Sequence, residues 1–346
     1  MRRIAVNGAT LLRGIAGIPR LTRYLIDALH TLPDVEVRVV TPTRQRGRSS
    51  VLNAIGDTWW DFRGAEAAAD GADLLVSPCN IGGARRTPHL LCVADIMPLE
   101  HPEYFDRKFA RYFRTVMPYA LRRATRVITN SNHVRQRLLE LAPRADIHIL
   151  ALPGGRTPRP RVGFPVGIKR ALVVGATEPH KNQVAAVTAV ALAREHHHED
   201  LRLDLVGPVG RAEATLAEHI RRMDPTGAWV TRHVGISDAA LDALYAAAWV
   251  LIQPSINEGY GLPLVESAEH GLPAIHSGAG AMTEVAPLGN AGGTDPESLM
   301  RALGALLDRA AWEAHAAGVR EIAKQRSWDA FKRQLRDIVE PMLGSR

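Results

Sequence analysis

Short runs of aliphatic residues alternate with longer amphipathic segments along the chain, and this alternation predicts an α/β fold with parallel sheets. In the first half the strands are expected at residues 3–6, 35–40, 74–77, 90–94, 126–130 and 147–150. Apolar residues at helical spacing predict helices between them, for example at 19–31, 108–123 and 134–142. The second half repeats the pattern, with a helix at about 183–196 and strands at 170–175, 202–206, 229–233, 250–253 and 274–276.

The length of 346 residues exceeds one ordinary core, so two domains are expected. Residues 153–167 are rich in Pro, Gly and Arg and show no periodicity, which is typical of a linker. We therefore predict an N-terminal domain at 1–160, a C-terminal domain at 161–325 and a final segment at 326–346. Within that last segment, residues 328–343 have the apolar spacing of an amphipathic helix.

The charge is unevenly divided between the two halves. Residues 1–160 carry 24 Lys and Arg against 14 Asp and Glu, whereas residues 161–346 carry 19 against 22. A basic half beside a nearly neutral one suggests contact with an anionic surface or substrate. No helix-turn-helix, zinc-finger or RNA-binding aromatic pattern accompanies the charge, so nucleic acid is not expected as a partner.

Cysteine content and the apolar runs indicate the compartment. Cys79 and Cys92 are too few for a disulfide framework and lack metal-ligand spacing. The basic start is followed by a short strand rather than a signal-peptide core, and the apolar runs at 184–193 and 243–252 are too short to span a bilayer. We expect a cytoplasmic protein.

The most informative segment, 253–267, reads QPSINEGYGLPLVES. A strand runs into a loop with two glycines, Pro263 opens a helix and Gly271 ends it. The loop would present backbone N–H groups and the positive end of a helix at the carboxyl edge of a sheet, where phosphates bind. Glu258 could accept hydrogen bonds from sugar hydroxyls there, and Glu266 could accept them from the two hydroxyls of a ribose. The alternative is that both are ordinary helix-start glutamates.

A second segment, 173–182, reads VVGATEPHKN. A strand again ends at a glycine, a polar loop follows, and a helix begins. Lys181 in this loop is a mobile point charge suited to a diphosphate. The alternative is a solvated lysine at a helix start.

Together the two segments resemble the family-4 retaining glycosyltransferases of the GT-B fold, especially the mannosyltransferase-like members. Segment 258–266 is similar to their Glu-x7-Glu motif, and 173–182 to their Val-Gly-Thr-Leu-Glu-Pro-Arg-Lys-Asn loop. Further similarity, in the family's order, lies at 17–20, 95–105, 205–208, 234–245, 284–285 and 327–328. The resemblance implies two Rossmann-like domains whose parallel sheets face a central cleft, with a C-terminal helix that crosses back to the N-terminal domain.

The resemblance also implies an activity: transfer of a hexose, with mannose from GDP-mannose as the best match, from a nucleotide sugar to a glycan, lipid-linked or small-molecule acceptor. The residues expected to be catalytic are Glu258, Lys181 and Asp95. Those expected to bind the donor are Glu266, Gly259, Tyr260, Gly261, Leu262, Gly17, Thr177, Glu178, Gly207 and Ile236.

No metal and no cofactor are expected. The chain has no Asp-x-Asp motif, and a lysine with a helix N-terminus would neutralise the leaving diphosphate. No residue is an obvious nucleophile. The resemblance instead implies reaction on the front face of the sugar, with the departing phosphate accepting the acceptor's proton.

Two positions depart from the family pattern. Ala94 stands where members commonly carry histidine, and Pro19 where they commonly carry glycine. Both lie on the acceptor side. They leave open a different function, that of a catalytically silent subunit that binds a nucleotide sugar or supports a partner enzyme. A phosphorylase or sugar epimerase of the same fold is disfavoured by the two motifs.

Segment 104–114 combines aromatic and basic residues at helical spacing. A helix of this kind could lie on an anionic membrane and meet lipid-linked acceptors there, giving a peripheral location at the inner membrane face. The alternative is that its aromatics pack on the sheet. Two further patterns are set aside: the histidines at 196–198 as a solvated helix end, and 278–280 because a third glycine for dinucleotide binding is missing.

Overall fold

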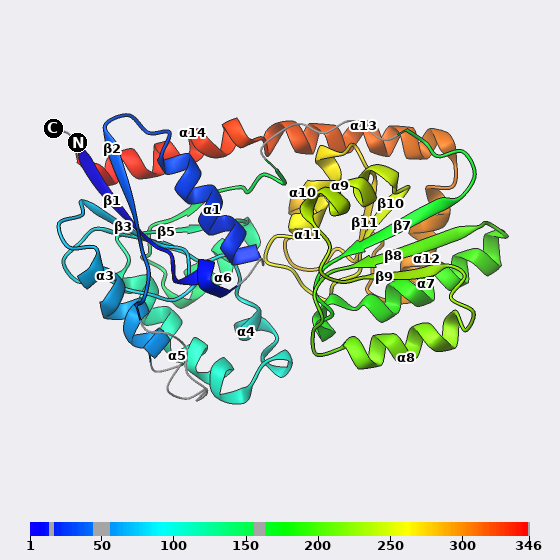
Figure 1. Ribbon diagram of the computed structural model, residues 1–346, viewed down its shortest axis with the longest axis horizontal. Helices are drawn as coiled ribbons and strands as arrows, with labels where there is room; N and C mark the ends of the chain where they lie inside the picture. The colour runs from blue at the N-terminus through cyan, green and yellow to red at the C-terminus, as the bar shows by residue number, and fades with distance from the viewer. Residues whose placement is uncertain (14–16, 44–55, 156–162, 345–346) are drawn as a thin grey trace. The chain divides into compact units, whose positions relative to one another are not determined.

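The computed structural model describes residues 1–13, 17–43, 56–155 and 163–344. The chain divides into two compact units, Met1–Leu152 together with Asp329–Arg346, and Pro153–Trp328. Each unit contains a sheet of parallel strands with helices on its faces (Figure 1), which confirms the predicted α/β fold class. The predicted domain boundary at residue 160 lies outside the described residues.

The first sheet has the order β2-β1-β3-β4-β5-β6, with parallel pairing throughout. Its strands are β1 (Arg2–Asn7), β2 (Val35–Val40), β3 (Leu74–Ser77), β4 (His89–Cys92), β5 (Arg126–Thr129) and β6 (Ile147–Ile149). Every residue of β3 and β4 is buried, as expected for strands covered on both faces, whereas the edge strand β2 exposes half of its residues.

Helices α5 (Arg107–Arg123) and α6 (Asn132–Leu141) of this unit begin directly after residues that cap them. The carboxylate of Asp106 accepts from two backbone N–H groups at the start of α5, and Ser131 caps α6. The helical elements are η1 (Ala9–Arg13), α1 (Gly17–Leu29), the π-helical turn η2 (Trp60–Gly64), α3 (Ala65–Ala68), α4 (Met97–Glu100), η3 (Pro102–Tyr104), α5 (Arg107–Arg123) and α6 (Asn132–Leu141).

The second sheet has the order β11-β10-β7-β8-β9, also parallel. Its strands are β7 (Lys169–Val174), β8 (Leu201–Val206), β9 (Val230–His233), β10 (Val250–Gln253) and β11 (Ala274–His276). The helical elements around it are η4 (Pro179–Lys181), α7 (Gln183–His197), α8 (Glu213–Met223), α9 (Asp238–Ala247), α10 (Leu262–Glu269), α11 (Met282–Val285), α12 (Pro296–Ala305) and α13 (Arg309–Gln325).

Small and large side chains share the core of the second unit. Ala186, Ala189 and Ala193 of α7 are fully buried and allow this helix to lie close to its neighbours. Trp249 and Trp312 fill the remaining volume, and Nε1 of Trp312 donates to the carbonyl of Trp249 at 2.7 Å. The indole N–H of Trp312 is therefore paired, whereas that of Trp249 is buried without a hydrogen-bond partner among the described residues.

The last helix, α14 (Trp328–Val339), packs on the first unit. The ring of Phe331 lies 6.2 Å from that of Tyr24, and the side chain of Gln334 accepts from the backbone N–H of Ala151 at 3.1 Å. The helix was expected to continue to residue 343, but it ends at Val339 and a 3-10 turn, η5 (Glu340–Leu343), follows. Pro341 causes this end, because it has no N–H for the helical ladder.

The start of the predicted linker is part of the second unit. The N–H of Gly155 donates to the carboxylate of Glu269 at 2.8 Å, so the chain is held against α10 before residue 156. Residues 156–162 lie outside the described residues. Across the described ranges, none of the helices has the length and apolar character that a membrane span requires.

Candidate functional site

The strand order of the second sheet reverses between β7 and β10, and two loops flank this point. From β7 the chain adds β8 and β9 on one side, and then β10 and β11 on the other. Ligands of open parallel sheets bind beyond the carboxyl ends of the strands at such a switch point. The loop after β7 carries Lys181 and the loop after β10 carries Glu258, so the topology brings these two predicted residues together.

Lys181 and Glu258 form an ion pair at this point. The Nζ of Lys181 lies 2.7 Å from Oε1 of Glu258, and the same oxygen accepts from Nε2 of Gln253 and Oγ of Ser255, each at 2.7 Å. The Glu258 side chain is 12% exposed. Within the described ranges Oε2 of Glu258 accepts no hydrogen bond, and it is therefore available to a ligand hydroxyl.

The surroundings keep the carboxylate of Glu258 ionised. Burial alone would raise the pKa of Glu258, but the charge of Lys181 and the hydrogen bonds from Lys181 and Ser255 hold that pKa below its usual value of 4.5. Burial, helped by the positive charge of Lys181, lowers the pKa of His180 to about 4. At pH 7 the carboxylate of Glu258 is therefore ionised and the imidazole of His180 is neutral.

Two of the residues that hold Glu258 were not predicted. Gln253 and Ser255 are buried polar residues at the carboxyl end of β10. Polar side chains at the end of an otherwise apolar strand were the available signal, because buried polar groups need partners. Their amide and hydroxyl groups leave the carboxylate of Glu258 little freedom to rotate.

The loop after β11 supports the backbone of Glu258. The carbonyl of Glu258 accepts from the N–H of Ala281 at 2.9 Å. Gly280 has φ +62°, and a Cβ there would lie 2.4 Å from that carbonyl oxygen. Segment 278–280 was set aside in the sequence for lacking a third glycine, whereas in the structure Gly280 permits the close approach of two loops.

Asn182, in the loop after β7, bonds to the loop after β10 and to the segment before α12. It has a left-handed backbone, with φ 51°, between η4 and α7. Its Nδ2 donates to the carbonyls of Pro254 and Thr294, at 3.2 and 2.9 Å. The N–H of Ile256 donates to the carbonyl of His180 at 2.8 Å. The relative positions of Lys181 and Glu258 are therefore set by main-chain contacts as well as by their own ion pair.

The start of α10 follows Glu258 directly. Gly261 is the N-cap, with φ +86°, and Leu262 is the first helical residue. Gly259 and Tyr260 are buried in the turn that precedes it. Because a glycine cap has no side chain, the positive end of the helix dipole is not neutralised by a capping carboxylate. This geometry suits an anion.

Glu266 lies one turn inside α10. It is 9% exposed, and its Oε2 accepts from the hydroxyl of Tyr245 at 2.6 Å. A solvated helix-start glutamate would have neither property. The carboxylate is therefore a buried, oriented group on the helix that begins beside Glu258.

Thr177 lies in the loop after β7, and its hydroxyl bonds to other residues of the second unit. It is almost completely buried, its Oγ1 accepts from the N–H of Gly210 at 2.6 Å, and it donates to Glu213 at 2.5 Å. These contacts join the loops after β7 and β8. The structure thus gives Thr177 a supporting position.

Three more predicted donor residues lie on neighbouring loops. Glu178 pairs with Arg211, Nε to Oε2, at 2.7 Å. Gly207 has φ +148°, and a Cβ there would lie 2.1 Å from the carbonyl oxygen of Gly175, so only glycine permits this approach. Ile236 is half-buried in the loop after β9. All three follow carboxyl ends of strands.

Gly17 and Asp95 belong to the first unit. Gly17 is the exposed first residue of α1. Oδ1 of Asp95 accepts from the N–H of Met97 at 2.8 Å and so supports the start of α4, while the N–H of Ala94 donates to the side chain of Asn80 at 2.8 Å. Gly17 and Asp95 therefore do not belong to the group of predicted residues that the loops of the second unit bring together.

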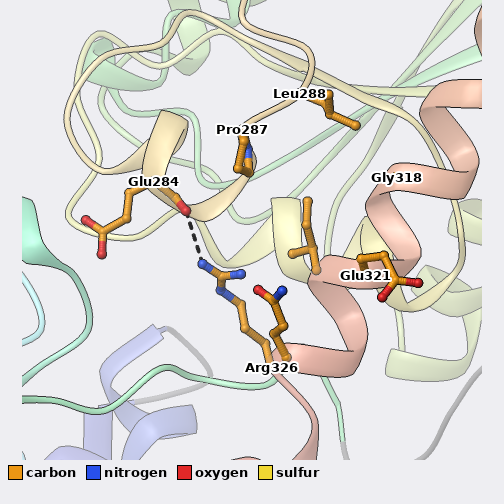
Figure 2. A pocket seen from close by; sticks show the side chains of 8 residues that line it. Glu284, Pro287, Leu288, Gly318, Glu321 and Arg326 are labelled. Atoms are coloured by element: carbon orange, nitrogen blue, oxygen red, sulfur yellow. Dashed lines mark hydrogen bonds between the residues drawn. The ribbon is translucent and has the colours of Figure 1, made fainter.

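A pocket of about 260 Å³ lies elsewhere in the second unit, between the segment after α11 and helix α13 (Figure 2). Across it, Arg326 donates from Nη2 to the carbonyl of Glu284 at 3.1 Å. Its lining consists of Glu284, Pro287, Leu288, Gly318, Glu321, Ile322, Gln325 and Arg326. None of the predicted donor residues lines it.

Among the described residues, no cluster of three or more His, Cys, Asp or Glu side chains could hold a metal ion. The independence from metal expected from the sequence stays a prediction.

Comparison with known proteins shows which family this arrangement belongs to. The profile described as glycosyl transferases group 1 matches residues 157–330, which is about half of the chain and contains the loops of both Lys181 and Glu258. The chain belongs to this family of glycosyltransferases. The O-antigen chain mannosyltransferase B of Escherichia coli is 30% identical over 254 residues, which make up 68% of this chain and 65% of that protein.

This chain spans 65% of the length of that relative and 52–56% of the length of three further relatives, each named D-inositol 3-phosphate glycosyltransferase. Solved structures match over nearly the whole chain. Sucrose-phosphate synthase from Thermosynechococcus elongatus has a TM-score of 0.79 at 17% identity and 99% coverage of both chains. HepE from Anabaena, in complex with UDP and glucose, has a TM-score of 0.71 at 17% identity, covering 98% of this chain and 99% of that one. The shared fold is GT-B.

Proposed function

We propose that this family member is a retaining glycosyltransferase that moves a hexose from a nucleotide sugar to a glycan, lipid-linked or small-molecule acceptor without a metal. The observation that carries the proposal is the Lys181–Glu258 pair at the switch point of the second sheet. A positive charge, an oriented carboxylate and a helix N-terminus are the groups that a sugar diphosphate requires.

Each group has a role in the proposal. Lys181 binds the diphosphate, with the backbone at the start of α10. Oε2 of Glu258 accepts from hydroxyls of the transferred sugar, and Glu266 accepts from the ribose hydroxyls. Binding of the diphosphate would draw Lys181 partly away from Glu258, and the bonds from Gln253 and Ser255 would keep that carboxylate in place.

The reaction follows from these roles. The bond between the anomeric carbon and the phosphate oxygen breaks, and the acceptor oxygen bonds to that carbon on the same face. The leaving phosphate oxygen takes the acceptor's proton. Lys181 and the helix N-terminus stabilise the negative charge that develops on the phosphate, which is the largest contribution such a site can make.

Mannose from GDP-mannose is the first donor to test. The support is the relative named as a mannosyltransferase, which shares 30% of its residues with this chain over the matched segment. That HepE was solved with UDP and glucose supports a nucleotide sugar as the class of donor.

A donor-hydrolysis assay tests the proposal. The unmodified chain is incubated with GDP-, UDP-, ADP- and dTDP-sugars, with EDTA and with added Mg²⁺ or Mn²⁺. We expect release of one nucleoside diphosphate, preferentially GDP, at the same rate in EDTA. Loss of activity in EDTA and its return with Mg²⁺ would contradict metal independence, and no turnover with any donor would contradict transferase activity.

We further propose weak association of the first unit with an anionic membrane, through the basic face of α5. Arg107, Arg111 and Arg114 are exposed, and Phe109 is 43% exposed. The packed side of the helix contains Phe113, which is 2% exposed. Basic residues near an anionic surface each contribute about 1 kcal/mol, so binding would be reversible and salt-sensitive.

Co-sedimentation with liposomes checks this association. We expect binding to phosphatidylserine-containing vesicles at low salt, release at raised salt and no binding to neutral phosphatidylcholine vesicles. Equal binding to both vesicles, or binding to neither, would contradict it.

A further inference from the structure

Tyr245 makes a short hydrogen bond to the carboxylate of Glu266. The hydroxyl donates to Oε2 at 2.6 Å, and the tyrosine and glutamate are 1% and 9% exposed. O–H donors to an ionised carboxylate lie at this distance, and such bonds are about twice as strong as those between neutral groups. This contact links α9 to the middle of α10 (Figure 1).

The ring of Tyr245 is itself held in one orientation. It stacks on His270, with centroids 5.0 Å apart and the planes 12° from parallel. His270 ends α10, and its N–H donates to the carbonyl of Glu266 at 3.3 Å. Tyr245 therefore contacts α10 at both ends of the same turn.

The backbone of Glu266 is fixed from another direction. Gly154 packs directly on it, because a Cβ at Gly154 would lie 2.8 Å from the N and 2.9 Å from the Cα of Glu266. With its main chain held by Gly154 and its side chain by Tyr245, Glu266 presents its carboxylate in one orientation. Such rigidity matters most for a group that must meet two vicinal hydroxyls at once.

We infer that Tyr245 is a positioning residue for ribose recognition by Glu266, an inference that rests on the proposed donor site. A carboxylate has about four acceptor positions, and the tyrosine hydroxyl occupies one of them. With its orientation set by this bond, the carboxylate meets the 2′ and 3′ hydroxyls at a set angle. The other role open to Tyr245 is purely structural, since it is the buried residue of α9.

Tyr245→Phe separates the two roles, because it removes the hydroxyl and keeps the stacked ring. We would measure Kd for GDP and for 2′-deoxy-GDP by calorimetry, and KM and kcat for the donor. The unmodified chain should prefer GDP, and Tyr245→Phe should reduce that preference at least about fivefold. KM should rise while kcat changes less than about twofold.

Ser267→Ala is the matched control. It removes another buried hydroxyl of α10, one that donates to the carbonyl of Leu264 at 2.8 Å, and should leave the preference unchanged. In a Glu266→Gln background, Tyr245→Phe should cause no further loss of preference. If Tyr245→Phe weakens both nucleotides equally, its role is structural and the inference is wrong.

Nucleotide binding by the unmodified chain distinguishes a failure of the role inferred for Tyr245 from a failure of the proposed function. If the unmodified chain binds GDP but does not distinguish 2′-deoxy-GDP, the inference is wrong and the donor site stands. If it binds none of GDP, UDP, ADP and dTDP, the proposed function itself is contradicted.

Discussion

The loops at the carboxyl edges of the two sheets are held by different kinds of contact. In the second unit, Glu258 accepts three side-chain hydrogen bonds on one oxygen, and the loops after β7, β10 and β11 bond to one another. In the first unit, Asp95 supports the start of a one-turn helix, and Gly17 begins a helix with open space around it.

This difference suggests how the two halves can diverge. A carboxylate held by several donors tolerates few changes, because removal of any partner leaves a buried charge unsatisfied. A position whose side chain is a methyl group, such as Ala94, can change without the loss of a side-chain hydrogen bond. The positions that depart from the family pattern, Ala94 and Pro19, both lie in the first unit. Pro19 is accommodated in the first turn of α1, where a missing N–H costs nothing.

The largest expected effect comes from breaking the central pair. Lys181→Ala and Glu258→Ala should each lower kcat at least about a hundredfold, the scale of losing one preorganised charge contact. Lys169→Ala is the control, because Lys169 forms an ion pair with Glu199 at 2.8 Å at the start of β7 in the same sheet. Near-wild-type turnover in both site variants would remove the basis of the donor-site assignment.

Gly280→Ala tests whether the neighbouring loop sets the position of Glu258. A Cβ would clash with the Glu258 backbone, and we expect kcat to fall about tenfold to a hundredfold, as for a displacement of about 1 Å. Gly227→Ala is the control: its φ, +67°, is similar to that of Gly280, +62°, but nothing lies within 4 Å. Equal kinetic effects in the two variants would show that general strain, and not displacement of Glu258, is responsible.

Glu266→Ala should act mainly on nucleotide binding. We expect KM for the donor to rise about tenfold with kcat little changed, since the ribose is bound equally in the ground and transition states. Steady-state kinetics would show the raised KM together with the nearly unchanged kcat. A fall in kcat as large as that of Glu258→Ala would place Glu266 at the reacting sugar.

The lowered pKa of Glu258 predicts a pH-dependent contribution to stability. A carboxyl group whose pKa is depressed on folding stabilises the protein fully above its unfolded value, 4.5, and loses this contribution as the pH falls through the lower folded value. Urea unfolding of the wild type and Glu258→Gln between pH 3 and 7 should show a difference that is constant above about pH 5 and shrinks below it. A difference that grows in acid would contradict the ionised pair.

Ala94→His should have the smallest effect. If the first unit contains a working acceptor side, activity should be unchanged or raised by no more than about tenfold, the scale of one added hydrogen bond. A silent subunit would show no turnover in either form and would still bind nucleotide in calorimetry. Turnover by the unmodified chain would exclude that function.

Much of the fold could be predicted from the sequence. Strand positions follow from short aliphatic runs, and each predicted strand agrees with the structure to within two residues. Lys181 and Glu258 could each be assigned to the carboxyl edge of the sheet because both follow strands, but their ion pair was not predicted. Glu266 could be placed on a helix, but its partner could not, since Tyr245 lies 21 residues away and belongs to another helix.

Other features of the site could be recognised only in the three-dimensional structure. Gln253 and Ser255 stand out in the sequence as polar residues at the end of an apolar strand, but only the structure shows that both donate to one oxygen of Glu258. The role of Gly280 depends on a contact between two loops that no local pattern encodes. The place of Thr177 in the family loop suggested a ligand contact, which stays a prediction; the structure adds that its hydroxyl joins Gly210 and Glu213.

A crystal structure of the chain with GDP tests the central claim most directly. We predict the β-phosphate within hydrogen-bond distance of Nζ of Lys181, the ribose hydroxyls on the carboxylate of Glu266, and Glu258 still bonded to Gln253 and Ser255. A nucleotide bound away from these residues, for example in the pocket beside Arg326, would contradict the assignment of the donor site to the loops after β7 and β10.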